Sequence, residues 1–183
     1  MSKGLPLEEL RSEHDVALAV MREVRDEARA ITASAPSTWS PGADKFLWRL
    51  RELRRALLLH FRKEEEALFP DVRAKVAEGA PAKDILGAFF GDQADDDLKA
   101  HHLLRQRTET LLDQLQELQR RGHLDAASCG PLAALADSTL DLLQRHADKE
   151  HKLVFPMIER LLDDSQIAAV RDRMRAISLG LAE

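Results

Sequence analysis

Apolar residues recur along this chain at steps of three and four, which is the spacing of one face of an α-helix. The first predicted helix spans about Leu7 to Ser34, and its stripe is Leu10, His14, Ala17, Met21, Val24, Ala28 and Ile31. Asp44 is the predicted cap of a second helix, which follows a loop marked by Pro36 and Pro41. The stripe of this second helix runs through Leu47, Leu50, Leu57, His60, Glu64, Leu68 and on to Val72 or Val76.

Three further helices are predicted in the second half of the chain. A helix from about Asp92 to Arg121 ends at Gly122 and has the stripe His101, Leu104, Thr108, Leu111, Leu115 and Leu118. The next begins near Gly130-Pro131, ends near Leu162, and has the inward residues Leu132, Leu135, Leu142, Leu143, His146, Glu150, Leu153, Val154, Met157 and Leu161. The last is capped by Asp163, Asp164 or Ser165, and its stripe is Ile167, Val170, Met174, Ile177 and Leu181.

These elements predict an all-α fold, because no segment has the alternating pattern of a strand. Four long helices joined by short loops favour an antiparallel up-down-up-down four-helix bundle over about residues 7–162. We expect one domain over residues 1–183, with an accessory C-terminal helix over about 164–181 that packs outside the bundle or forms a homodimer contact. The segment from Pro81 to Asp95 is expected to form a short helical turn or a packed loop at one end of the bundle.

Composition narrows the classes of function. Of the 183 residues, 44% are hydrophobic and 32% are charged, which is typical of amphipathic helices. The net charge of −5 comes from interleaved acidic and basic residues, so we expect no nucleic-acid partner. The lone cysteine, Cys129, excludes an internal disulfide and a thiolate-rich zinc site. With no signal-like or membrane-length apolar run, a cytoplasmic protein without a membrane partner is expected.

One histidine-glutamate block occurs twice. His60 and Glu64 are followed by Phe69-Pro70, and His146 and Glu150 are followed by Phe155-Pro156 at the same spacing. Residues four apart lie on one face of a helix, so each block offers an imidazole and a carboxylate together. Mixed imidazole and carboxylate ligands hold hard first-row metals such as iron, with manganese or zinc as possible substitutes.

The two prolines predict an interruption of each helix just after its histidine-glutamate block. Proline removes a backbone donor and clashes with the preceding turn. The helix should therefore kink or restart at Pro70 and Pro156, or else simply end there.

Each of the four long stripes carries one histidine, namely His14, His60, His101 or His146. A core with four imidazoles and two carboxylates among leucines would be costly to desolvate, and two metal ions would remove that cost. His14 precedes His60 by 46 residues and His101 precedes His146 by 45, so the two halves resemble each other. We therefore predict a dinuclear site in which Glu64 and Glu150 are bridging ligands.

These residues resemble the hemerythrin-like, or HHE cation-binding, family over about Leu10 to Leu162. The resemblance rests on His14, on His101, and on the two blocks that end in Phe-Pro. It implies a non-haem di-iron centre with Glu64 and Glu150 as bridges. The oxygen-carrying hemerythrins have two histidines four residues apart on the third ligand helix, whereas here Arg105 lies four residues after His101 and Asp97 four residues before it. They also have a carboxylate where this chain has His151. The bacterial HHE subgroup is therefore the closer match.

Three further residues have more than one interpretation. We favour His101 over the adjacent His102 as the ligand, because only His101 shares the apolar stripe. His151 is either a fifth histidine ligand or a residue at the rim of the site. Glu65 is expected to orient a ligating imidazole or to be solvated.

The predicted function is a di-iron protein that binds a small ligand such as O2, NO or peroxide, in oxygen, redox or nitrosative stress sensing or handling. The Glu-x-x-His motif of ferritin-like bundles and the HExxH motif of metalloproteases are both absent. A peroxide-disproportionating or peroxidase-type enzyme is the alternative, with Glu65, His151 or His102 as proton donor. A helical interaction module, or an iron store without turnover, is the second alternative.

Overall fold

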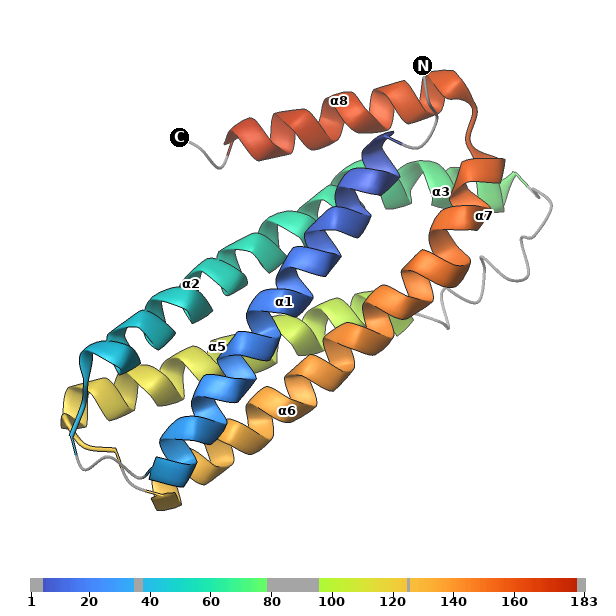
Figure 1. The fold of residues 1–183 in the computed structure, drawn as a ribbon. Coiled ribbons are helices and arrows are strands. Elements are labelled where there is room, and N and C mark those ends of the chain that lie inside the picture. The colour runs from blue at the N-terminus through green and yellow to red at the C-terminus, as the bar shows by residue number, and fades with distance from the viewer. Residues whose placement is uncertain (1–4, 35–37, 79–95, 125, 181–183) are drawn as a thin grey trace. The chain divides into compact units, whose positions relative to one another are not determined.

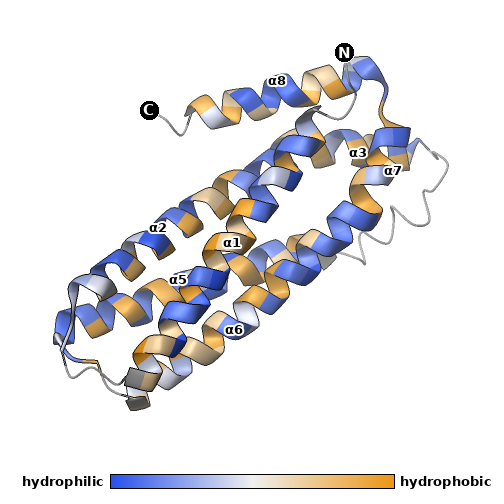
Figure 2. Cartoon of the chain, in the orientation of Figure 1, coloured by the Kyte–Doolittle hydropathy of each residue, from blue (hydrophilic) through white to orange (hydrophobic). Residues whose placement is uncertain are grey.

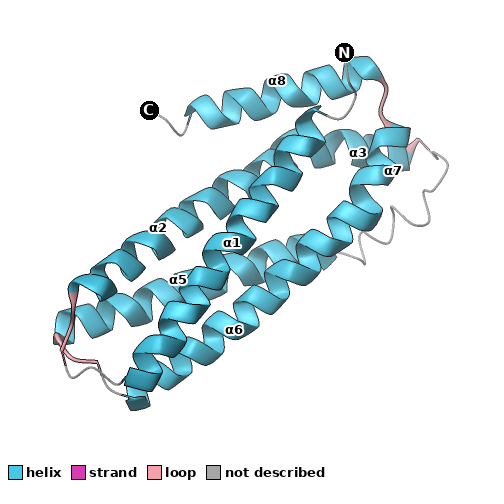
Figure 3. Ribbon diagram, viewed as in Figure 1, coloured by secondary structure: helices cyan, strands magenta, loops and turns pink. Residues whose placement is uncertain are grey.

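The computed structural model describes residues 5–34, 38–78, 96–124 and 126–180. In chain order its helices are α1 (Leu5–Ser34), α2 (Pro41–Arg62), η1 (Lys63–Leu68), α3 (Phe69–Ala77), α5 (Asp96–Arg121), α6 (Ala126–Lys149), η2 (Glu150–Val154), α7 (Phe155–Leu161) and α8 (Asp164–Gly180). Figure 1 labels the α-helices along the chain. Figure 2 shows hydrophobic and hydrophilic residues alternating around them, as expected of amphipathic helices. No strand occurs in these described ranges (Figure 3), so the all-α prediction is confirmed for them.

The second helix begins earlier than predicted. Ser40 caps it by accepting a hydrogen bond from the Ala43 amide at 3.3 Å, and Pro41 is its first residue. Proline suits this position because the first helical amides have no intrahelical acceptor. Asp44 is therefore not the cap, and its Oδ1 instead accepts hydrogen bonds from Trp39 Nε1 at 2.7 Å and from Gln119 Nε2 at 3.0 Å.

The fourth predicted helix also begins earlier, at Ala126, and Pro131 lies inside it. A proline inside a helix removes one backbone hydrogen bond, but α6 tolerates this loss close to its start. Pro131 therefore predicted the start of the helix only to within about a turn. The predicted terminator Gly122 is confirmed, because its φ of 66° is the left-handed value that glycine adopts freely. The predicted cap of α8 is confirmed as Asp163, whose Oδ1 accepts the amides of Ser165 and Gln166, each at 2.9 Å.

Contacts divide the chain into two units. One comprises Asp15–Leu57 and His102–Gln144, and its buried side chains include Met21, Val24, Phe46, Leu50, Leu104, Leu111, Leu115, Leu132 and Leu143. At its surface Arg49 pairs with Glu27 at 2.5 Å, and Arg29 pairs with Asp137 at 2.8 Å. This unit is thus an apolar core edged by ion pairs between helices.

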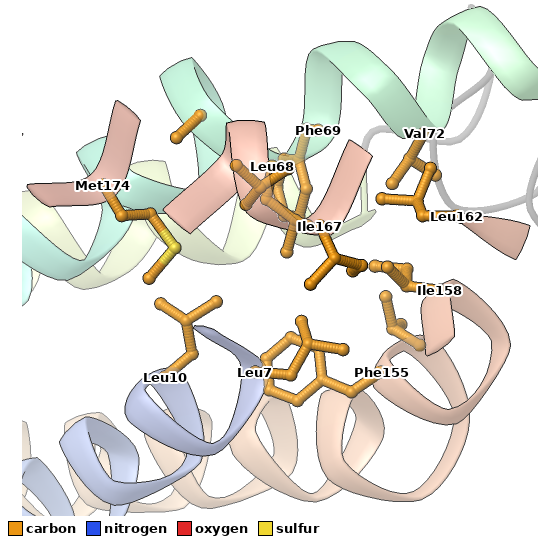
Figure 4. Close-up of a cluster of buried hydrophobic side chains, with 13 residues drawn as sticks. Leu7, Leu10, Leu68, Phe69, Val72, Phe155, Ile158, Leu162, Ile167 and Met174 are labelled. Carbon is orange, nitrogen blue, oxygen red and sulfur yellow. The ribbon is translucent and has the colours of Figure 1, made fainter. Parts of the chain in front are cut away.

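The other unit comprises Met1–His14, Leu58–His101 and Arg145–Glu183, and it contains a separate apolar cluster. Side chains of α1, η1, α3, α7 and α8 meet in it, as Figure 4 shows: Leu7, Leu10, Leu68, Phe69, Val72, Phe155, Ile158, Leu162, Ile167 and Met174. Through Ile167, Val170 and Met174, α8 buries its apolar stripe against its own chain. Arg173 on the same helix donates to the Ala67 carbonyl at 2.8 Å and to Asp71 Oδ2 at 2.6 Å.

Both histidine-glutamate blocks lead into a π-helical turn. The amide of Phe69 donates to the Glu64 carbonyl and the amide of Phe155 donates to the Glu150 carbonyl, five residues back in each case. Pro70 and Pro156 follow at once, at the start of α3 and α7. The wider turn relieves the clash that a proline ring makes in a continuing α-helix, and such turns are frequent at functional sites. The predicted interruption is confirmed, and it takes the form of a π-turn.

The π-turn changes which residues face inward after Glu150. Leu153 was predicted inward but is 51% exposed, so that prediction is wrong. One extra residue in the turn rotates the following residues by about 100° around the helix. Phe155 and Ile158 are buried after it.

Several predictions concern residues or arrangements outside this description. The segment from Pro81 to Asp95 is predicted to pack at a bundle end and lies outside the described residues, as does Leu181. The antiparallel bundle, the single domain and the homodimer through the C-terminal helix stay predictions. None of the described helices combines the length and the apolar character needed to cross a membrane.

Candidate metal centre

All six predicted ligands lie together in the unit that contains both π-turns, η1 and η2. Two overlapping groups have ligand atoms within 4.8 Å of one another: His14, His60, His146 and Glu150 form one, and Glu64, His101, His146 and Glu150 form the other. Every member is buried. They come from α1, the end of α2, η1, the start of α5, the end of α6 and η2.

The Nε2 atoms of the histidines lie beside the two carboxylates. Glu64 spans two imidazoles, because its Oε1 is 3.2 Å from His60 Nε2 and its Oε2 is 3.1 Å from His101 Nε2. Glu150 Oε2 lies 3.3 Å from His14 Nε2 and 3.7 Å from His146 Nε2. Each carboxylate therefore faces two imidazoles from different helices.

Three of the histidines have their other ring nitrogen, Nδ1, bonded on the outer side. His60 Nδ1 is 2.9 Å from Glu13 Oε2, His101 Nδ1 is 2.7 Å from Glu65 Oε1, and His14 Nδ1 is 3.1 Å from His151 Nε2. Such outer partners fix the tautomer of a ligating imidazole and its orientation. This arrangement leaves the Nε2 atoms directed at the carboxylates.

Several inner atoms lack a good hydrogen bond, despite the short distances. Both Glu64 carboxylate oxygens, His101 Nε2 and both ring nitrogens of His146 are buried without a hydrogen-bond partner among the described residues. His14 and His60 also bring their Nε2 atoms to 2.8 Å from each other. Buried lone pairs left in this state are costly, and a cation among them would satisfy them. The residues present therefore fit a metal ion.

The electrostatics divide the histidines into two classes. Burial lowers the pKa of His14 to about 3, with a contribution from His60. Burial also acts to lower the pKa of His60, but Glu64 and Glu13 outweigh it and raise that pKa to about 9. The pKa of His101 is raised by Glu64 and Glu65 against burial.

The same charges act on the remaining members of the cluster. Burial and the neighbouring His101 hold the pKa of His146 well below its ordinary value. Burial acts to raise the pKa of Glu64, yet His60 and His101 hold it well below the usual range. The raised pKa values of His60 and His101 and the lowered pKa of Glu64 share one cause, the attraction between these groups, and a bound cation would replace it.

Aromatic rings enclose the cluster. Phe61 stacks on His101 with ring centroids 4.2 Å apart, and Phe69 stacks on it at 6.1 Å. Phe155 stacks on His14 at 6.2 Å. Phe69 and Phe155 also belong to the apolar cluster under α8. Water is therefore kept from this side of the site.

The residues with open interpretations fall outside both ligand groups. His102 is exposed, which agrees with the preference for His101. Glu65 is hydrogen-bonded to His101 Nδ1, in agreement with the prediction that it orients a ligating imidazole. His151 is hydrogen-bonded to His14 Nδ1. Sequence reasoning missed the outer role of Glu13, and it missed Lys63 altogether.

A signal for Lys63 was present in the sequence. Lys63 lies three residues after His60, on the same helix face, and is 3% exposed. A charged residue on a ligand stripe requires a partner, and Lys63 Nζ donates to Glu9 Oε1 at 2.6 Å and to Glu13 Oε1. The burial of an ammonium beside a candidate ligand could thus have been suspected.

Comparison with known proteins supports the predicted family over the first part of the chain. No curated protein matches the chain. A family model described as Hemerythrin HHE cation binding domain matches residues 5–87, a segment that includes His14, His60 and Glu64. The second block lies beyond the match, yet His146 and Glu150 complete both ligand groups. The hemerythrin HHE family predicted from the sequence is confirmed by this match for residues 5–87, which are less than half of the chain.

Proposed function

We propose that this protein holds two iron ions in the buried cluster and binds a small ligand such as O2, NO or peroxide there. The observation that carries the proposal is the pair of overlapping ligand groups, which share His146 and Glu150. Two groups with shared members suit two neighbouring ions better than one. Manganese or zinc accept similar donors, so cellular supply would decide between them.

Glu64 and Glu150 are the proposed bridging ligands. The two oxygens of Glu64 face His60 and His101, which belong to different groups. Glu150 is a member of both groups. His14 and His60 would bind on one side and His101 on the other, with His146 able to serve either.

Iron would supply redox chemistry and open coordination positions, because six side chains do not fill the coordination of two octahedral ions. The chain's own residues orient the imidazoles and exclude water. Glu13, Glu65 and His151 hold the outer ring nitrogens, as described above. Phe61 and Phe155 cover two of the histidines.

For such a site we propose a role in sensing or handling oxygen, redox or nitrosative stress. The peroxidase-type alternative requires a proton donor. Glu65 and His151 each bond the outer Nδ1 of a candidate ligand, which favours positioning over proton delivery. Binding without turnover is therefore our preferred form of the proposal.

Optical titration tests the proposal. Anaerobically reduced, iron-loaded protein is mixed in turn with O2, NO and hydrogen peroxide, and spectra are recorded beside those of Glu150→Gln. We expect new absorption bands with at least one ligand in the wild type and their loss in the variant. Spectra identical to those of free iron with all three ligands would contradict ligand binding, whereas sustained peroxide turnover would favour the enzyme.

A further inference from the structure

Lys63 is a buried cation beside the candidate metal centre. No other lysine or arginine in the described part of the chain is buried. An ammonium removed from water is strongly destabilising unless it is paired and hydrogen-bonded. Lys63 meets that requirement through two carboxylates of α1, Glu9 and Glu13. Burial acts to lower its pKa, and these two carboxylates outweigh burial and raise it.

Glu13 connects this ammonium to a candidate ligand. Its Oε1 accepts from Lys63 Nζ, and its Oε2 accepts from His60 Nδ1 at 2.9 Å. Both oxygens of the carboxylate are thus engaged, so its plane and position are fixed. His60 in turn presents Nε2 to Glu64 at 3.2 Å. One chain of contacts therefore runs from Lys63 through Glu13 and His60 to a proposed bridging residue.

The two charges in this chain of contacts act in opposite senses. A carboxylate that accepts a hydrogen bond from Nδ1–H makes Nε2 of the same imidazole a more basic ligand for a metal ion. An ammonium on the far oxygen withdraws part of that negative charge. At low local dielectric both effects extend to an ion at Nε2.

We propose that Lys63 is a positioning residue that acts on His60 through Glu13 by offsetting the charge of that carboxylate, so that the Lys63–Glu13 pair tunes the affinity of the ion bound beside His60. The inference rests on the proposed function. It goes further in assigning a role to Lys63, which is not a ligand and lies outside both ligand groups.

This role predicts opposite changes in metal affinity when Glu13 and Lys63 are each neutralised, whereas a merely structural role predicts a loss of affinity in both cases. Affinity for Co²⁺, a spectroscopic stand-in for Fe²⁺, is measured by competition with a chelator in wild type, Glu13→Gln, Lys63→Met and the double variant. We expect Glu13→Gln to weaken binding at the His60 position about tenfold, as removal of an outer partner does. Lys63→Met should tighten it, and the double variant should lie between the two. Weakening in both single variants, or no change in Lys63→Met, would overturn the proposal.

A matched control and a rescue accompany the test. Arg62 and Glu66 form an exposed pair one residue from Lys63 and two from Glu64, with Arg62 Nε donating to Glu66 Oε1 at 2.9 Å. Arg62→Met and Glu66→Gln repeat the charge changes at the surface and should leave Co²⁺ affinity within about twofold, because solvent screens exposed charges. Lys63→Arg, which keeps the cation, should retain wild-type affinity if circular dichroism shows it folded.

Glu9 provides a second test that leaves the buried residues intact. Glu9→Gln removes one of the two carboxylates on Lys63 Nζ. The ammonium then offsets more of the negative charge of Glu13, so Co²⁺ affinity should fall about two- to threefold. This is less than the roughly tenfold loss expected when an outer partner is removed. An unchanged affinity would overturn the inference even if Lys63→Met fails to fold. Absence of Co²⁺ binding in the wild type would overturn the proposed function itself, whereas normal binding with the wrong signs would overturn the role of Lys63 alone.

Discussion

Glu64→Gln is the substitution that most directly tests the role of the inner carboxylates in metal binding. It keeps the size and shape of a fully buried side chain and removes its charge. The two Glu64 oxygens face His60 Nε2 and His101 Nε2, so the change affects both ligand groups. We expect the variant to fold without metal and to lose most of the stabilisation that metal gives the wild type.

The magnitude follows from binding linkage. At a free metal concentration about 100 times Kd, each ion stabilises the folded state by about 2.7 kcal/mol, so two independent ions add about 5 kcal/mol. For a chain of this length each kcal/mol raises Tm by about 2–4 °C, which predicts a rise of about 10–20 °C. A roughly 100-fold loss of affinity leaves about 0.4 kcal/mol for each ion at the same concentration, or about 2–3 °C in total.

Thermal unfolding followed by circular dichroism, with and without Co²⁺, measures this difference. Glu66→Gln is the matched control, because Glu66 is an exposed carboxylate two residues further along the same turn. The control should show the wild-type rise. A metal-induced rise in Glu64→Gln equal to that of the wild type would refute the assignment of Glu64 as a ligand.

Three further outcomes are expected. Because Glu64 and Glu13 raise the pKa of His60 to about 9 against burial, metal must displace its proton. Co²⁺ affinity should therefore increase with pH between 6.5 and about 9, and a flat profile in chelator competition would contradict this. Arg173→Met removes the hydrogen bonds to the Ala67 carbonyl and should lower the free energy of unfolding by about 1 kcal/mol in urea, whereas exposed Arg175→Met should not. Leu153→Ala should be nearly neutral in the same assay and Val154→Ala should cost about 1–3 kcal/mol, and the reverse order would contradict the π-turn at η2.

Helical periodicity accounts for much of what could be predicted from the sequence. The stripe through Leu10, His14, Ala17 and Met21 is buried, because a 3.6-residue period leaves one face to pack. The six ligands predicted from the histidine-glutamate spacing and from the apolar stripes likewise lie close together in the structure. Local chemistry was sufficient at these positions, since they lie within regular helix.

The errors arose where the helical period or its punctuation changes. A π-turn carries an extra residue that no periodic template includes, so Leu153 cannot be placed from spacing alone.

 Leu153 is exposed because η2 intervenes between Glu150 and Phe155. Pro131 and Asp44 were read as helix starts, although each also fits within the first turns of a helix. Long-range pairing was the other gap, since Lys63 meets Glu9 and Glu13 from a helix about 50 residues away.

Metal content per chain tests the central claim most directly. Protein produced with added iron is purified without chelator, and its iron, manganese and zinc are measured together with its concentration by amino-acid analysis. Two buried ligand groups that share His146 and Glu150 predict close to two metal ions per chain, and His60→Ala should fall well below that value while exposed His102→Ala keeps it. Well under one ion per chain in the wild type, after reconstitution with excess Fe²⁺, would contradict the account.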